Sequence, residues 1–225
     1  MKQNCTLCES GADLFWQQKS GVSWKAYHLE KNAPACLNFY KCSICDLIFK
    51  DPKIYLSAEF EKARYETHQS GEGQQGYENF LQKIILQMEK NIKRGMYGLD
   101  FGSGRDATLA KILGEKNILC ESYDPIFFPK VELLEKSYDF VFCTEAVEHF
   151  YSPQKEFQLL EVLLKPMAYL GIMTQLAPSD FQNWWYHRDP THVAFYSEKT
   201  FQWIADKFFY QLEFHAGGVI LLQKS

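Results

Sequence analysis

Two glycines and two acidic residues form the first pattern in the sequence that could bind a ligand. The run Asp100-Phe101-Gly102-Ser103-Gly104 stands where an apolar segment turns into an amphipathic one, and Asp124 follows the next apolar segment. Glycines at such a turn let the backbone approach a ligand closely. A carboxylate after the next strand can accept hydrogen bonds from both hydroxyls of an adenosine ribose. We therefore predict an adenosine pocket; in the simpler interpretation the glycines form only a tight turn and Asp124 caps a strand.

Glu145, Glu148 and His149 form a second pattern, directly after another apolar segment. Ligands of open α/β folds bind at the carboxyl edge of the sheet, where these residues should lie. Two carboxylates and one or two imidazoles suit Mg²⁺, Mn²⁺ or Zn²⁺, and His192 is our candidate for a fourth ligand. Ordinary ordering of the loop is the simpler interpretation.

The same acidic and imidazole groups could act without a metal. His149 or His192 could serve as a general base, with Glu148 as a third candidate catalytic residue. Trp185 and Tyr186 belong to an aromatic-rich segment and would then form a wall for the substrate.

Four of the seven cysteines form two C-x-x-C pairs, Cys5/Cys8 and Cys42/Cys45. Four thiolates on two tight turns give Zn²⁺ a closed, structural, tetrahedral site. The 33 residues between the pairs exceed the usual interval of about 15–20, so we expect an insertion carrying Trp16 and Trp24 to be looped out. Cys36 could replace one ligand, and chance pairing of buried free cysteines is the simpler interpretation.

Composition bounds the function classes. The chain has 225 residues, of which 46% are hydrophobic, and a formal net charge of -4, so it can bury a core but has no general basic field. Nucleic acid is therefore not favoured as a partner. An apolar run of membrane-spanning length and a secretion signal are both missing from the sequence, and the number of cysteines is odd. We expect a cytoplasmic protein with no membrane partner.

Alternating strand and helix patterns must position these residues. The predicted elements are an amphipathic helix over Tyr77–Ile92, strands over Met96–Phe101, Ile118–Tyr123 and Tyr138–Cys143, helices over Asp106–Leu113 and Pro153–Leu164, and a hairpin of Tyr210–Ala216 with Val219–Gln223. This order predicts a Rossmann-like α/β fold with a mostly parallel sheet and right-handed crossovers. We divide the chain into a zinc-ribbon-like head over 1–55, a linker or lid loop over 56–76 and the α/β domain over 77–225.

From residue 77 to the end, the sequence resembles the class I methyltransferases that depend on S-adenosylmethionine (SAM). Residues 100–104 look like their first motif, Asp124 like their ribose-binding acid, Tyr138–Glu145 like their fourth strand, and Leu163–Thr174 like their last turn and fifth strand. The resemblance implies a seven-stranded sheet whose last strand is antiparallel. It also implies a set of SAM contacts: Asp100, Gly102, Ser103, Gly104, Asp124, Pro125, Thr144 and Glu145.

The sequence departs from this family in two places. The usual Pro-Gly-Gly turn reads Pro166-Met167-Ala168, and only about fifteen residues separate Asp124 from Asp139. That interval is too short for a full helix and a full third strand. We therefore expect the third strand to be stunted or absent, which removes the position where family members place an adenine-binding residue.

Two further resemblances concern the acceptor and the head. The Glu-x-x-Glu-His run is similar to that of ubiquinone-pathway O-methyltransferases and of small-RNA 3′-end 2′-O-methyltransferases, in which a metal orients the accepting hydroxyls. A zinc-ribbon head before this domain resembles a group of small bacterial methyltransferases in which Tyr65–His68 and Asp189–His192 also have counterparts. His68 is then a candidate lid or substrate contact.

We predict a methyltransferase that moves a methyl group from SAM to a small-molecule or macromolecular acceptor, with O-methylation slightly favoured. The alternative is a non-catalytic module that senses SAM while its zinc head docks a protein or RNA partner. An NAD-dependent oxidoreductase is a third interpretation. It is disfavoured because Arg105 and Asp106 stand where the third glycine of a dinucleotide loop would fall.

Overall fold

The structure, a computed structural model, describes residues 2–19, 21–28, 34–67, 74–208 and 210–225. The chain divides into two compact units, each made of three separate segments. The first unit comprises residues 1–68, 148–155 and 175–203, and the second comprises residues 69–147, 156–174 and 204–225.

The second unit is built on a six-stranded sheet in the order β10-β11-β8-β7-β5-β6. Its strands are β5 (Tyr97–Phe101), β6 (Leu119–Tyr123), β7 (Tyr138–Thr144), β8 (Leu164–Met173), β10 (Tyr210–His215) and β11 (Val219–Lys224). The strands β6, β5, β7 and β8 run parallel, whereas β11 is antiparallel to β8 and to β10. The predicted Rossmann-like sheet with an antiparallel end is therefore confirmed.

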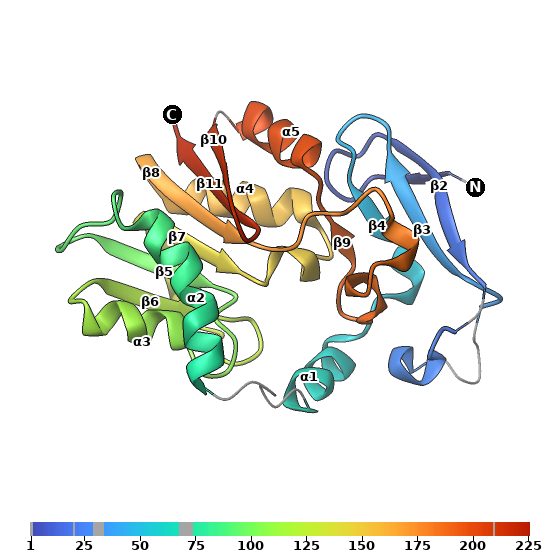
Figure 1. The fold of residues 1–225 in the computed structure, drawn as a ribbon, viewed down its shortest axis with the longest axis horizontal. Helices are drawn as coiled ribbons and strands as arrows, with labels where there is room; N and C mark the ends of the chain where they lie inside the picture. The colour runs from blue at the N-terminus through green and yellow to red at the C-terminus, as the bar shows by residue number, and fades with distance from the viewer. Residues whose placement is uncertain (1, 20, 29–33, 68–73, 209) are drawn as a thin grey trace. The chain divides into compact units, whose positions relative to one another are not determined.

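Helices cover this sheet, whose central strands β5 and β7 are buried along most of their length. The helices are α2 (Gln74–Met88), α3 (Thr108–Glu115), α4 (Pro153–Leu163) and α5 (Glu198–Phe208). In Figure 1, α2 crosses in front of the sheet and α4 lies behind it. The helices predicted over the stretches of α2, α3 and α4 are confirmed within a few residues of their ends, whereas α5 was not predicted.

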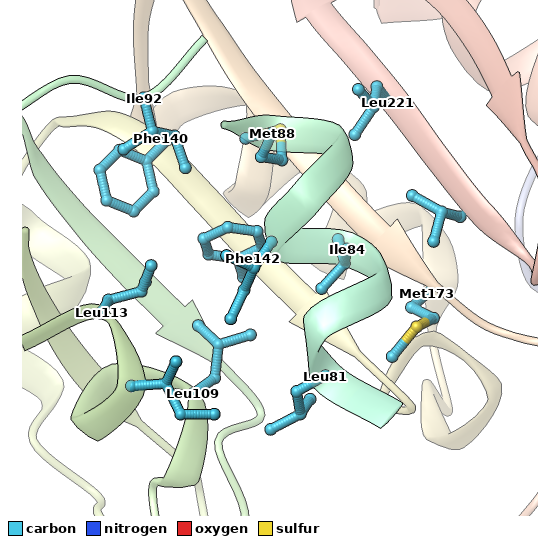
Figure 2. Close-up of a cluster of buried hydrophobic side chains, with 13 residues drawn as sticks. Leu81, Ile84, Met88, Ile92, Leu109, Leu113, Phe140, Phe142, Met173 and Leu221 are labelled. Atoms are coloured by element: carbon cyan, nitrogen blue, oxygen red, sulfur yellow. The ribbon is translucent and has the colours of Figure 1, made fainter. Parts of the chain in front are cut away.

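One face of the sheet forms the main core with α2 and α3. Ile84 and Met88 of α2 point between Phe140 and Phe142 of β7 and Leu221 of β11, as Figure 2 shows. All five side chains are 1% exposed or less, so each contributes roughly 1.5–3 kcal/mol of burial free energy. This packing fixes β5 and β7, the two strands that lead to the glycine loop and to Glu145.

Glycine residues in the sheet make room for the two phenylalanine rings. Gly98 of β5 pairs with Phe140, and Gly171 of β8 pairs with Phe142. A Cβ added at Gly98 would lie 1.9 Å from a ring carbon of Phe140, and one at Gly171 would lie 3.2 Å from Phe142. The rings therefore lie directly over the backbone of the neighbouring strands.

The sheet ends at β6 among the described residues. After Asp124 the chain makes a tight turn closed by an antiparallel bridge between Asp124 and Phe128, then one 3₁₀ turn over Val131–Glu135, and enters β7. The expected loss of the third strand is confirmed, and the seven strands that the resemblance implied become six. The physical reason is length, since these residues are used up by two turns.

The departure from the Pro-Gly-Gly turn has a visible consequence in β8. Met167 stands in that turn with a φ of 63°, a left-handed conformation that glycine adopts at no steric cost. Its side chain is 60% exposed. The strand thus keeps the backbone shape of the turn although a non-glycine residue occupies it.

The first unit contains a second, antiparallel sheet in the order β1-β2-β3-β4-β9. Its strands are β1 (Lys2–Asn4), β2 (Gly11–Gln18), β3 (Leu37–Cys42), β4 (Ile48–Lys50) and β9 (Ala194–Phe195). Trp16 lies in β2 and stacks on Phe39 of β3, with ring centroids 5.0 Å apart. The expectation that Trp16 is looped out is therefore wrong, because β2 is a full strand that pairs with β3.

The described part of the predicted linker over 56–76 is mostly helical. Helix α1 spans Ala58–Thr67, while residues 68–73 lie outside the described residues. The predicted division at residues 55 and 76 stays a prediction. The contacts add two later segments, 148–155 and 175–203, to the N-terminal unit.

None of the helices that the structure describes is both long enough and apolar enough to span a bilayer.

The contact between Gly98 and Phe140 yields a stability prediction. Gly98→Ala forces its methyl group into the Phe140 ring, so we expect the free energy of unfolding to fall by about 2 kcal/mol or more. The matched control is Gly114→Ala in α3, where nothing lies within 4 Å of the added Cβ. This control should be neutral or gain about 0.5–1 kcal/mol from helix propensity. Urea denaturation of both variants checks the prediction, and equal midpoints would contradict it.

Candidate cofactor and metal sites

The glycine loop joins the end of β5 to α3 in the second unit. Gly102 and Gly104 have φ values of +77° and +66°, which residues with a side chain rarely adopt. A Cβ added at Gly102 would also lie 2.7 Å from the Cβ of Ala146, so the loop passes directly against the segment after β7. The backbone N–H groups of Gly102 and Ser103 donate to the carbonyl of Tyr123, which ties the loop to the end of β6.

Asp124 is the side chain that holds this loop in place. Its Oδ2 accepts a hydrogen bond from the Gly104 N–H at 3.0 Å. Its Oδ1 accepts bonds from the N–H groups of Ile126 and Phe127 at 2.8 and 2.9 Å. The carboxylate therefore caps the turn after β6 and also meets the glycine loop directly. Oδ1 thus uses both of its lone pairs, whereas Oδ2 keeps a second one, so a predicted ribose contact at Oδ2 is compatible with these bonds.

Asp100 lies at the end of β5 and is almost completely buried, with 1% of its surface exposed. Burial raises the pKa of the Asp100 carboxyl to about 7, and the neighbouring Asp124 carboxylate adds to the rise. Its Oδ1 atom has no hydrogen-bond partner among the described residues. A buried oxygen in this state destabilises the protein unless a ligand donates to it.

Two residues near the loop have strained backbones. Ala107, just before α3, and Glu145, just after β7, both have a φ of 47°, although neither is glycine. Left-handed conformations of such residues cost roughly 1–2 kcal/mol and cluster at ligand sites. The N–H of Glu145 donates to the carbonyl of Met173 at 2.7 Å. Thr144 is buried at the end of β7, and Pro125 is exposed in the turn after β6.

The four cysteines of the C-x-x-C pairs meet in the first unit. Their sulfur atoms all lie within 4.8 Å of one another. The Sγ atoms of Cys5 and Cys45 are 3.4 Å apart, and those of Cys8 and Cys42 are 3.3 Å apart. These separations are close to the roughly 3.8 Å expected between thiolates on one tetrahedral Zn²⁺ ion.

The two cysteine turns have the same backbone design. Cys5 and Cys42 each donate their N–H to a carbonyl five residues later, and each accepts a bond from the N–H four residues later. In both turns that fourth residue, Glu9 or Asp46, is left-handed. The N–H of Leu7 points to the Cys5 sulfur at 3.5 Å. A hydrogen bond from Cys45 lowers the pKa of Cys5 to about 6, so one thiolate is favoured before any metal binds.

Cys36, the alternative ligand, lies apart from this group. Its Sγ donates to Oδ1 of Asn38 at 3.3 Å and accepts a bond from the side-chain amide of Gln17.

Glu148, His149 and His192 form a second potential metal group in the first unit, with one ligand atom from each within 4.8 Å of the others. Nδ1 of His149 bonds the carbonyl of Thr191 at 3.1 Å, and Nδ1 of His192 bonds the carbonyl of Tyr186 at 2.8 Å. A carbonyl only accepts, so both Nδ1 atoms carry the proton and both Nε2 atoms present a lone pair. This is how metal-binding histidines are usually oriented. Glu145, the remaining predicted ligand, belongs to the other unit.

Burial and hydrogen bonds hold the side chains of this group in place. Glu148 is 1% exposed and accepts a very short hydrogen bond from the Tyr186 hydroxyl. Burial and the nearby His149 together lower the pKa of His192 to about 3, so His192 is neutral at pH 7. A neutral imidazole beside a carboxylate can bind a cation or accept a proton. Trp185, predicted as part of a substrate wall, is 59% exposed.

Lys50 is a residue of this region that the sequence analysis missed. It is 0% exposed, and its Nζ donates to the carbonyl of Asp189 at 2.6 Å. Burial lowers its pKa to about 7. Asp189 in turn accepts bonds from the N–H and hydroxyl of Thr191 and pairs with Arg64. Lys50 and Arg64 thus fix the turn that carries His192. A lysine in a short apolar strand gives no sequence signal for this role.

Tyr65 of α1 also contacts the group, with its ring 5.5 Å from that of His149. Its predicted neighbour His68, the candidate lid residue, lies outside the described residues.

Comparison with known proteins gives the family. The sequence model of a family described as "Methyltransferase domain" matches residues 74–213, more than half of the chain. The chain belongs to this methyltransferase family. The match confirms the resemblance to the class I SAM-dependent methyltransferases and the prediction that the chain is an enzyme. Among curated proteins, none matches the sequence of this methyltransferase.

Solved structures share the fold at low sequence identity. A SAM-dependent methyltransferase from Archaeoglobus fulgidus is 17% identical with a TM-score of 0.52, over 65% of this chain and 94% of that one. The 1,6-didemethyltoxoflavin-N1-methyltransferase of Burkholderia thailandensis, with bound S-adenosylhomocysteine, is 12% identical with a TM-score of 0.51, over 84% and 96%. The magnesium protoporphyrin IX methyltransferase of Synechocystis is 14% identical with a TM-score of 0.50, over 75% and 95%.

The buried Asp100 yields a prediction for the pH dependence of stability. Its folded-state pKa of about 7 is above the ordinary value of 3.8, so folding is favoured at low pH, and this stability is lost as the pH rises through about 7. Asp100→Asn removes that ionisation. We compare the free energies of unfolding of the ligand-free variant and the wild-type methyltransferase. Between pH 4 and pH 8, their difference should shift in favour of the variant by on the order of 3 kcal/mol.

Urea denaturation of the ligand-free proteins at several pH values measures this gain. Asp106→Asn is the matched control, because Asp106 is exposed in the same loop. Parallel pH profiles for wild type and Asp100→Asn would contradict the prediction.

Proposed function

We propose that this methyltransferase binds SAM in the glycine loop of its second unit and transfers the methyl group to a small molecule. The supporting observation is the buried Oδ1 of Asp100, which lacks a donor among the described residues. It lies at the end of β5, directly before the two left-handed glycines. An amino group of a ligand held in that loop would supply the missing donor.

The residues around the loop suit an adenosyl ligand. Oδ2 of Asp124 offers a lone pair to a ribose hydroxyl, and the glycine backbone leaves space where side chains would otherwise stand. SAM, when bound, supplies a methyl group on a sulfonium, which is already an activated leaving group. The protein then needs mainly to hold donor and acceptor in line, which lowers the barrier by up to about 7–11 kcal/mol. The loss of the third strand removes one wall of such a pocket, so we expect the adenine ring to be more exposed than usual.

We further propose that the four cysteines hold one structural Zn²⁺ ion. The sulfur separations, the paired turns and the burial of Cys5, Cys42 and Cys45 all suit a closed site. Such an ion would join the turn after β1 to the turn after β3. Its contribution is to the stability of the first unit, because a site with four protein ligands has no open position for catalysis.

Glu148, His149 and His192 support O-methylation as the more specific proposal. An oxygen acceptor has to lose a proton, and this group offers either a neutral imidazole as the base or three ligands for Mg²⁺ or Mn²⁺. Both Nε2 lone pairs are already oriented by the Nδ1 hydrogen bonds. Two neighbours that are named for small molecules, magnesium protoporphyrin IX and 1,6-didemethyltoxoflavin, support a small-molecule acceptor.

SAM binding tests the main proposal. We expect calorimetry on zinc-replete protein to show binding of both SAM and S-adenosylhomocysteine. Asp124→Asn should weaken the binding of SAM at least about tenfold, since a charge-assisted hydrogen bond is worth roughly 1.5–3 kcal/mol. Asp106→Asn, in the same loop but exposed, should bind like wild type.

Slow release of S-adenosylhomocysteine without added acceptor would favour an active enzyme over a SAM-sensing module. Absence of heat with either ligand in folded protein would refute the proposal. A melting temperature raised by NADH, and not by SAM, would support an oxidoreductase instead.

Metal analysis separates the two proposed metal sites. We expect about one zinc per wild-type chain and a loss of zinc and of stability in Cys8→Ser. His192→Ala should keep its zinc, because His192 lies outside the cysteine group. Mn²⁺ added to chelator-treated wild type should raise the melting temperature, and His192→Ala should abolish this rise. If Mn²⁺ leaves the wild type unchanged, the divalent site is excluded and the imidazoles remain as candidate bases.

A further inference from the structure

A cavity of about 660 Å³ lies within the first unit, apart from both metal groups. Its lining includes Trp16 of β2, Leu37 of β3, Tyr27 of the 3₁₀ turn Trp24–Tyr27, and His187. The volume is in the range that holds small ligands, and apolar rings with a few polar groups are the usual lining of such sites.

The aromatic walls of this cavity are fixed by their packing. Trp16 stacks on Phe39, and its edge meets His187 with centroids 5.1 Å apart. His187 stacks on Phe181 at 5.1 Å. Because Trp16 and His187 each pack against a neighbouring ring, the walls lose little side-chain freedom when a ligand binds. Flat rings of this kind favour a planar ligand.

The charge of the lining differs from that of the whole chain. The lining residues include the cations Lys19 and Arg188, both exposed, and none of the lining residues that the structure describes is acidic. The chain as a whole has a net charge of -4. A cavity with two cations at its lining attracts anions over the background field of the protein.

His187 keeps the lining free of a third charge. Its Nε2 bonds the carbonyl of Gln182 at 3.3 Å, so Nε2 carries the proton. Burial keeps the pKa of His187 below its ordinary value, and the positive Lys50 and Arg188 act in the same direction, which favours the neutral ring. His187 is 1% exposed and its Nδ1 atom is buried, so the ring closes one side of the cavity and offers it no hydrogen-bonding atom.

We propose that this cavity binds a small planar aromatic anion. The rings would hold its flat face, and Lys19 and Arg188 its negative charge. The proposal does not rest on methyl transfer, because all of these residues belong to the first unit. It can be measured in Asp124→Asn as well as in wild type.

Three indoles that differ in charge provide the test. We expect calorimetry to show binding of indole-3-acetate, at least tenfold weaker binding of the neutral indole-3-acetamide, and none of the cationic tryptamine up to about 10 mM. Raising the NaCl concentration should weaken the binding of indole-3-acetate. Lys19→Gln and Arg188→Gln should each weaken it about three- to tenfold, whereas Lys53→Gln, an exposed lysine outside the lining, should not. Ala26→Trp, which places a large ring at the lining, should abolish binding.

Equal affinities for the three charge types, unchanged binding in Ala26→Trp, or no binding of indole-3-acetate at about 10 mM would each overturn the proposal.

Discussion

The second unit depends on one carboxylate, that of Asp124. It accepts hydrogen bonds from the Gly104 N–H on one side and from the Ile126 and Phe127 N–H groups on the other. These bonds set the conformation of the glycine loop and of the turn after β6 together. The same group is the proposed ribose contact, so the residue that would bind the ligand also holds the loop around it. A carboxylate suits both roles because it only accepts and has about four acceptor positions.

Strain and burial at the sheet edge point to the same ligand. Gly102 lies against Ala146, Glu145 and Ala107 are left-handed, and Asp100 is buried with an oxygen that lacks a donor. The left-handed residues and the buried oxygen lower the stability of the ligand-free protein, and the packing of α2 and α3 on β7 must offset the sum. A ligand that donates to Asp100 and fills the space above the glycines would remove part of this unfavourable free energy on binding. These features therefore support a ligand at this edge of the sheet.

The sequence predicted the second unit well because its signals are local. Apolar runs located the strands, the Gly102–Gly104 loop lay between β5 and α3, and the short interval after Asp124 predicted the missing strand. The first unit was harder, since β9 comes from residues far along the chain and β2 was expected to be looped out. Lys50 could not be predicted as a support for Asp189, because its partner lies 139 positions away and its burial is a tertiary property. The burial of Asp100 was hidden for the same reason.

The two histidines show how a candidate site can be read beyond its residue types. From the sequence, His149 and His192 could equally have been core residues or ligands. The carbonyls of Thr191 and Tyr186 take the Nδ1 protons, and so both Nε2 lone pairs are left for a metal or an acceptor proton. Val193, the residue after His192, donates its N–H to the carbonyl of Glu148, so the backbone joins the two halves of the group. A pair of surface histidines needs none of these bonds. Their presence around Glu148 favours a site in which the direction of each nitrogen matters, as it does in both metal binding and base catalysis.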